Sequence, residues 1–294
     1  MIIVELQGGL GNQMFQYACG KALSIKHNQK LLIDLTFLQQ NQLETEGFTP
    51  RLYELGIFRL DTEVAGKQLI KSFTGESFYK KIFKLLKLPL KECYCEIPGK
   101  GASQMDKIAF PVLLKGYWQS EYYFSDYKNE IRKAFKFDIE SVTEIQDTIA
   151  QINQTNSVSI HFRRGDYLTN PVAKKVLGPL DIDYYKEAIS KIQSEIEKPF
   201  FFIFSDDPEW VKENFPLSEN YKVIDGSHKD KPYHDMLLMS KCKHHIISNS
   251  SFSWWGAWLN PDPQKVVIAP KRWFADEHMN ITSTNLVPGE WIRI

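Results

Sequence analysis

The sequence predicts an α/β protein built from two parallel sheets with helices on both faces. Short apolar runs alternate with amphipathic helical stretches, and turns rich in glycine or hydroxyl residues follow several of the runs. The alternation occurs twice along the 294 residues, which predicts two domains over about 1–150 and 151–294. Parallel strands need a crossover connection, so a regular strand–helix alternation favours parallel sheets.

The first domain begins with a βαβ unit. In chain order we expect a strand over 1–6, a glycine-rich turn over 7–12, a helix over 13–27 and a second strand over 31–35. The pattern from 36 to 110 is less regular, with polar segments between helical pieces. GYWQSEYYF at 116–124 mixes aromatic and polar residues, and 126–153 is expected to be helical.

The second domain alternates more regularly. The expected strands are VSIHF at 158–162, PFFFIFSDD at 199–207, YKVID at 221–225, HIISN at 245–249 and KVVIAP at 265–270. The expected helices are 180–198, 207–215, 234–244 and 251–260. In the last of these, Trp254, Trp255 and Trp258 are expected to be core residues, and the tail over 275–294 has no regular pattern.

Composition limits the class of partner and the compartment. Lysine plus arginine equals aspartate plus glutamate, 36 against 36, so we expect no nucleic-acid partner. The four cysteines form no CxxC pair and are expected to be reduced, mostly buried thiols. The N-terminus resembles a first strand and not a signal peptide, and no apolar run is long enough to span a membrane, so we expect a cytoplasmic protein.

Residues 77–91 contain a lysine stripe at helical spacing opposite an apolar face. The stripe consists of Lys80, Lys84, Lys87 and Lys91. Such a helix is compatible with weak peripheral contact to the inner face of an anionic membrane. An ordinary surface helix explains the same pattern, and we favour it.

The segment HFRRGDY places two arginines directly after a strand that reads as buried. A buried guanidinium is costly unless an anion meets it, and arginine is well suited to bind a diphosphate. We expect one arginine to meet a ligand and the other to turn back to a carboxylate such as Asp166 and hold the loop. The alternative is an internal arginine–aspartate ion pair without a ligand.

Other candidate sites also follow expected strands, where open parallel sheets bind ligands. Gly9-Leu10-Gly11 could receive an anion at a helix N-terminus, or form a tight turn with no ligand. Ser248–Ser251 could serve a phosphate, although simple helix capping explains it alone. Asp206 follows another strand and is a further candidate.

The acidic motifs of the sequence are better explained by a structural role than by metal binding. Asp181-Ile182-Asp183 has the spacing of a DxD metal site, but it precedes a helix, so Asp183 is expected to be an N-cap. No His, Cys or Asp spacing is typical of zinc. We therefore expect no metal and no cofactor.

Taken together, three motifs resemble those of the bacterial α-1,2-fucosyltransferases, glycosyltransferase family 11. They are GGLGNQMFQY, HFRRGDY and SNSSFSWWGAWLN, and the likeness extends to GYWQSEYYF and the closing NLVPGEWIRI. The resemblance implies a GT-B fold, in which two Rossmann-like domains face a cleft. It places the acceptor mostly on the first domain and GDP-fucose mostly on the second.

The resemblance also implies roles for individual residues. Arg163 would grip the β-phosphate as a catalytic residue, His161 and Asp235 would contact guanosine, and Ser251 would bind the diphosphate. The remaining substrate-binding residues would be Gly11, Asn12, Arg164, Asp206, Asn249, Ser250 and Phe252.

The implied reaction is inverting and metal-independent. It would transfer L-fucose from GDP-β-L-fucose to the 2-hydroxyl of a terminal β-galactose in a glycan. A general base should take the acceptor proton. Asp166 is the first candidate, although its closeness to Arg163 favours a salt bridge, and Glu121 is the second.

Several alternatives stay open. Gly9, Gly11 and Asp34 nearly match a dinucleotide fingerprint, which would indicate an NAD-dependent oxidoreductase, but Met14 stands where a glycine is needed for close helix–strand packing. A non-catalytic glycan-binding protein would use its tryptophans for sugar. A fucosyltransferase with another linkage or acceptor, including a protein acceptor, would keep the same donor chemistry.

Overall fold

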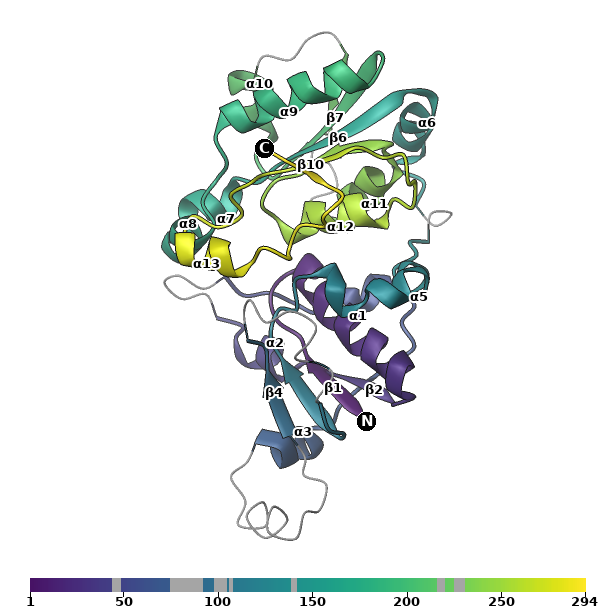
Figure 1. Ribbon diagram of the computed structural model, residues 1–294, viewed down its shortest axis with the longest axis vertical. Coiled ribbons are helices and arrows are strands. Elements are labelled where there is room, and N and C mark those ends of the chain that lie inside the picture. Colours follow the sequence, from purple (N-terminus) through teal and green to yellow (C-terminus); the bar gives the residue numbers. More distant parts are fainter. Residues whose placement is uncertain are drawn as a thin grey trace. The chain divides into compact units, whose positions relative to one another are not determined.

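The chain divides into two compact units in the computed structural model, which describes residues 1–43, 49–74, 92–97, 105, 108–138, 142–215, 220–224 and 231–294 (Figure 1). The first unit holds the described residues up to Lys136 together with Thr282–Leu286, and the second holds the others. The sequence-based boundary near residue 150 falls inside helix α6 (Gln146–Gln154), which belongs to the second unit.

The first unit has a parallel sheet with strand order β3-β2-β1-β5-β4. Its strands are β1 (Ile2–Glu5), β2 (Leu31–Asp34), β3 (Glu63–Val64), β4 (Glu92–Cys95) and β5 (Val112–Lys115). Its helices are α1 (Leu10–His27), α2 (Thr36–Gln40), α3 (Lys67–Thr74) and α5 (Lys128–Ala134), with short 3-10 turns at Leu55–Ile57, Glu121–Tyr123 and Ser125–Tyr127. The central strand β1 is wholly buried, so its ends are rigidly placed.

The second unit has a parallel sheet with strand order β11-β10-β9-β6-β7-β8. Its strands are β6 (Asn156–Phe162), β7 (Pro199–Ser205), β8 (Tyr221–Val223), β9 (His244–Ile246), β10 (Val267–Ala269) and β11 (Ile292–Arg293). Besides α6, its helices are α7 (Gly165–Thr169), α8 (Pro171–Val176), α9 (Ile182–Glu195), α10 (Pro208–Asn214), α11 (Tyr233–Lys241), α12 (Ser251–Leu259) and α13 (Glu277–Thr282).

The strand order of the second sheet reverses direction once, between β6 and β9. Numbered from its own first strand, the second sheet has the order 3-2-1-4-5-6 of a Rossmann fold, and the first has the related order 3-2-1-5-4, in which β1 and β5 are neighbours. The predicted α/β class with two Rossmann-like domains, the components of the GT-B type, is therefore confirmed.

Several elements differ from the sequence-based expectation. Helix α1 begins at Leu10 and so includes part of the expected turn, and the expected helix over 126–153 is two helices, α5 and α6. Strands β4 and β5 lie in or directly after the segment that seemed irregular. The tail supplies an edge strand, β11, because Ile292 pairs with Ile268 of β10.

The buried aromatic residues confirm one expectation. Trp254 and Trp255 are fully buried and Trp258 nearly so, which makes them core residues. Trp254 and Trp258 stack with ring centres 6.0 Å apart. Because its aromatic side chains are held in the core, α12 has a fixed position, and so has its N-terminus.

Two other expectations are wrong in part. Cys19 and Cys242 are buried, but Cys93 and Cys95 are exposed on the edge strand β4. Asp183 is not an N-cap, because Asp181 precedes the first residue of α9 and Asp183 forms an exposed ion pair with Lys186.

Within the described ranges no helix is long and apolar enough to cross a membrane, and the lysine stripe at 77–91 lies outside those ranges.

Candidate active site

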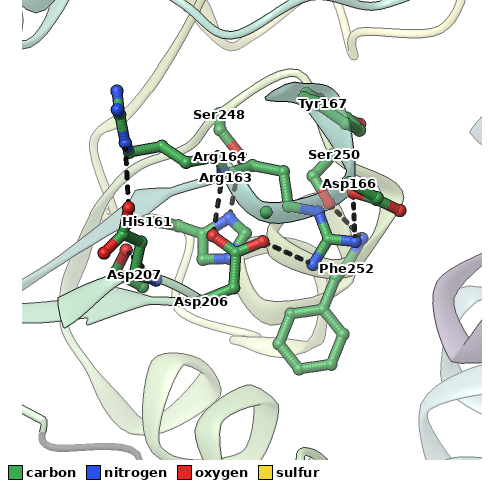
Figure 2. A network of polar contacts seen from close by, with 12 residues as sticks. His161, Arg163, Arg164, Asp166, Tyr167, Asp206, Asp207, Ser248, Ser250 and Phe252 are labelled. Carbon is green, nitrogen blue, oxygen red and sulfur yellow. Dashed lines mark hydrogen bonds and ion pairs between the residues drawn. The ribbon is translucent and has the colours of Figure 1, made fainter. Parts of the chain in front are cut away.

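The candidate site lies at the switch point of the second sheet. His161 is the second-last residue of β6 and Arg163 directly follows the strand, and the loop beginning at Ser248 follows β9, which pairs with β6. Asp206 directly follows β7, the other neighbour of β6. Carboxyl ends of parallel strands meet at one edge, so these loops converge where open α/β sheets bind ligands (Figure 2).

His161 joins the two central loops. Its Nδ1 atom lies 2.8 Å from Ser248 Oγ, and its ring centre lies 5.9 Å from that of Phe252 in α12. The imidazole is buried, and burial together with the nearby Arg163 charge lowers the pKa of His161 to about 3. The ring is therefore neutral near pH 7, and a neutral imidazole can hydrogen-bond to a ligand without adding charge.

Arg163 is clamped between two carboxylates (Figure 2). Its Nη2 donates to Asp166 Oδ1 at 2.7 Å and its Nη1 lies 3.1 Å from Asp206 Oδ2. Burial opposes the charged form, but the carboxylates of Asp206 and Asp166 outweigh it and raise the pKa of Arg163. A guanidinium has five N–H donors, so its remaining donors can serve a phosphate oxygen. About a quarter of the side chain, 25%, is exposed.

Arg164 turns away from Arg163. Its Cζ lies 3.4 Å from the centre of the Trp210 ring, and its Nε lies 3.5 Å from Asp207 Oδ2. The backbone N–H of Arg164 donates to Asp206 Oδ1 at 2.9 Å, so both Asp206 oxygens brace this loop. The two arginines thus separate, but Asp166 pairs with Arg163 and not with the arginine that holds the loop, which corrects the expected pairing.

Asn249 has the contacts of a structural residue, although it was expected to bind substrate. Its side chain is buried, and its Nδ2 lies 3.0–3.1 Å from the carbonyl oxygens of Leu177, Gly178 and Trp273. Its backbone carbonyl oxygen accepts a hydrogen bond from the hydroxyl of Tyr167 in α7 at 3.0 Å. Asn249 therefore locks the loop that leads into α12.

The next residues form the start of α12. Ser250 is the N-cap and its Oγ accepts from the backbone N–H of Phe252 at 3.3 Å, which confirms the capping interpretation of this motif. Ser251 is the first residue of the helix. A helix N-terminus attracts negative charge, so this position suits a phosphate.

Asp235 is a second acidic candidate and lies in the first turn of α11. Burial raises the pKa of its carboxyl to about 7. Among the described residues, no hydrogen bond or ion pair to this carboxyl is seen. A desolvated carboxyl of this kind can accept N–H groups from a ligand.

Gly11 and Asn12 belong to the other unit, in the first turn of α1. Gly8 before them has φ +73°, and a Cβ there would collide with the Asn12 side chain. Asn12 Oδ1 accepts a hydrogen bond from Gln119 Nε2 at 2.7 Å. Glu121, the second candidate base, is ion-paired with Lys128 at 2.9 Å.

Two contributing residues were missed from the sequence. Trp210 stacks on Arg164, and Gln119 orients Asn12. Ser248, which the sequence placed in a candidate phosphate site, instead contacts and orients His161. Within the described part of the chain, no group of three His, Cys, Asp or Glu side chains is placed to hold a metal ion.

The proteins that this chain resembles in sequence are glycosyltransferases, which defines the class of protein. An α-1,2-colitosyltransferase of Escherichia coli is 38% identical over all of this chain and 99% of its own length. The O-antigen biosynthesis glycosyltransferase WbnK of Escherichia coli is 32% identical over 98% of this chain and 99% of its own. The model of glycosyl transferase family 11 matches residues 67–294, and the chain belongs to this family.

More distant proteins complete the comparison. The galactoside 2-α-L-fucosyltransferase SEC1 of Bos taurus is 26% identical over 87% of this chain and 63% of its own length. Among solved structures, NodZ α-1,6-fucosyltransferase soaked with GDP-fucose covers 88% of this chain and 92% of its own, with 13% identity and a TM-score of 0.46.

Proposed function

We propose that the protein transfers L-fucose from GDP-β-L-fucose to the 2-hydroxyl of a terminal β-galactose in a glycan, with inversion and without a metal ion. The observation that carries this proposal is Arg163, a clamped guanidinium at the switch point between β6 and β9. Family membership supports sugar transfer. The names of two relatives, one α-1,2-specific and one acting on galactosides, support the linkage and the acceptor.

Two groups of residues in the second unit hold the donor, one at the guanosine and one at the diphosphate. The ionised carboxyl of Asp235 accepts the N–H groups of guanine, and neutral His161 completes the guanosine contacts. The diphosphate lies against Arg163 and the first turn of α12, where Ser251 and the capped helix N-terminus favour negative charge. Arg164 and Asn249 act indirectly, because they hold the loops in place.

In the reaction, the acceptor oxygen attacks the anomeric carbon from the face opposite the diphosphate. The glycosidic bond forms as the bond to the β-phosphate oxygen breaks, and the acceptor proton passes to a base. Negative charge grows on the β-phosphate, and Arg163 stabilises it in a geometry set in advance by Asp166 and Asp206. This preorganised cation takes the role that a metal ion has in other glycosyltransferases.

Asp166 has an orienting role in this scheme. Asp166 is ion-paired with Arg163 and Glu121 with Lys128, and a neighbouring cation makes a carboxylate a weaker base. We assign Asp166 to the catalytic unit through Arg163 and leave the proton acceptor unassigned.

The decisive test is incubation with GDP-fucose and lactose or N-acetyllactosamine in the presence of EDTA, followed by NMR of the product. An α-1,2-linked fucoside would support donor, linkage, inversion and metal independence together. Transfer that EDTA abolishes would refute metal independence. Tight GDP binding without transfer would refute either the acceptor or fucose as the transferred sugar, and no GDP binding would refute a GDP-sugar donor.

A colitose donor is the second candidate, because an α-1,2-colitosyltransferase is 38% identical over the whole chain. Colitose is L-fucose without its 3-hydroxyl. Sites that hydrogen-bond a substrate hydroxyl reject the analogue that lacks it strongly, whereas the reverse discrimination is weak. The ratio of kcat/KM for GDP-fucose to that for GDP-colitose in one competition assay decides between them. A ratio far above one would favour fucose, and a ratio near or below one would favour colitose.

A further inference from the structure

Strands β1 and β5 are parallel neighbours in the first sheet, so the loops that follow their carboxyl ends lie at the same edge. The loop after β1 leads to Asn12, and the loop after β5, residues 116–119, ends at Gln119. Their side-chain amides are joined by the 2.7 Å hydrogen bond from Gln119 Nε2 to Asn12 Oδ1. Gln16 of α1 also donates to the Gly116 carbonyl oxygen at 3.1 Å. The loop 116–119 is therefore fixed at the place where an open parallel sheet binds its ligand.

The backbone of this loop is strained at Trp118, which has φ +54°, a left-handed conformation that bulky residues rarely adopt. Gly116 has φ +156°, which glycine adopts without strain. The carboxylate of Glu96 compensates, because its Oε2 accepts the backbone N–H groups of Tyr117 and Trp118, each at 2.8 Å. Glu96 Oε1 also accepts from the Tyr123 hydroxyl at 3.3 Å. Strain maintained by several dedicated contacts is typical of functional sites.

The two neighbouring aromatic residues of this loop differ in burial. Trp118 is fully buried, stacked with Tyr94 at 6.4 Å and edge-on to Tyr123 at 5.3 Å between ring centres. Tyr117 is left 45% exposed. The loop thus uses one ring as an anchor and presents the other to solvent, two residues from the Gln119–Asn12 pair.

We propose that Tyr117, Gln119 and Asn12 bind the acceptor sugar, and that Glu96 is a positioning residue for them; this inference rests on the proposed function. A neutral sugar offers an apolar C–H face to an aromatic ring and hydroxyls that both donate and accept. Side-chain amides also donate and accept, and among the described residues no further hydrogen bond to the Gln119 or Asn12 amide is seen. Small-ligand sites typically combine aromatic side chains with a few placed polar groups, and this part of the first unit supplies both kinds.

The first test compares Tyr117→Ala with Tyr122→Ala. Both tyrosines are exposed and lie in the same segment, but Tyr122 has no part in the proposal. Tyr117→Ala should raise the acceptor KM about 10-fold, with the KM for GDP-fucose and the affinity for GDP unchanged. Tyr117→Phe should restore most of the loss, and Tyr122→Ala should change neither constant. An unchanged acceptor KM in Tyr117→Ala would overturn the proposal.

The second test concerns positioning. Glu96→Gln replaces a carboxylate oxygen with an amide group, which cannot accept from every donor that now faces Glu96. The acceptor KM should rise, while the donor KM and GDP affinity stay constant. A change that appears only in thermal stability would mean that Glu96 is structural.

Direct glycan binding separates this inference from the proposed function. Saturation-transfer NMR with lactose and N-acetyllactosamine, without any donor, should give signals with the wild-type protein and with Tyr122→Ala but not with Tyr117→Ala. This result would stand even if GDP-fucose is not the donor. Equal signals from Tyr117→Ala and wild type, or no signal from the wild-type protein, would overturn the acceptor site.

Discussion

Replacing Arg163 with alanine is the sharpest test of the donor site, because the structure gives two separate expectations. The first concerns folding. Arg163 makes ion pairs of 2.7 and 3.1 Å with Asp166 and Asp206, and all three side chains are about one-quarter exposed. An exposed ion pair contributes ~0–1 kcal/mol and breaking a buried one costs ~3–5 kcal/mol. We therefore expect the free energy of unfolding to fall by about 2 kcal/mol.

The second expectation concerns catalysis. Losing one preorganised donor to a developing oxyanion costs ~100–1,000-fold in rate. Arg163→Ala should therefore lower kcat by at least ~100-fold, measured at a temperature where urea unfolding shows the variant to be folded. Arg163→Lys should fall between, because a lysine carries the charge but lacks the planar fork that spans two carboxylates.

Arg164→Ala is the matched control. Arg164 also loses a carboxylate and an aromatic contact on substitution, so a comparable loss of stability is expected. Its rate should fall by less than ~10-fold, because its guanidinium is turned to Trp210. Near-normal turnover of Arg163→Ala, or equal rate losses in the two variants, would refute the assignment of the phosphate contact.

Three further predictions concern other residues. Burial raises the pKa of Asp235 to about 7, and in the proposed donor site guanine binds the ionised carboxyl. The affinity for GDP-fucose, measured by calorimetry, should therefore rise from about pH 6 to about pH 8 and then level off. Asp235→Asn should bind weakly and without this pH dependence. Asn249→Ala removes the amide that donates to three backbone carbonyl oxygens, so the free energy of unfolding measured by urea titration should fall by about 2–3 kcal/mol. A decrease below about 0.5 kcal/mol would contradict the role of Asn249 in locking the loop. Gly8→Ala should lower the melting temperature and activity, because φ is +73° and the new methyl group would meet Asn12, whereas Gly66→Ala, with no atom within 4 Å, serves as the control.

The same raised pKa has a consequence for folding. Asp235 holds its proton more tightly in the native state than in the unfolded chain, so the native state binds more protons between the ordinary pKa of 3.8 and about 7. The contribution of Asp235 to the free energy of unfolding is fully present below its pKa in the unfolded chain. It is lost as the pH rises through its pKa in the folded protein. Asp235→Asn should remove that slope, and an unchanged slope in urea titrations across this window would contradict the burial.

Local patterns in the sequence determined the class of fold and the place of the candidate site. The alternation of strands and helices requires only near neighbours, and it predicted two parallel sheets. The position of Arg163 after a buried run, and of Ser250 before a helix, likewise depends on adjacent residues. The positive-φ turn at Gly8 lies in the glycine-rich segment that the sequence marks as unusual.

Tertiary structure alone decided how those residues are used. β5 and β11 are strands because they pair with β1 and β10, and their short runs carry too weak a local signal to show it. The separation of Arg163 from Arg164 depends on carboxylates that follow a different strand, β7. The Gln119–Asn12 bond joins residues 107 positions apart. Such contacts arise only when distant segments pack together, and side-chain periodicity along the chain carries no record of them.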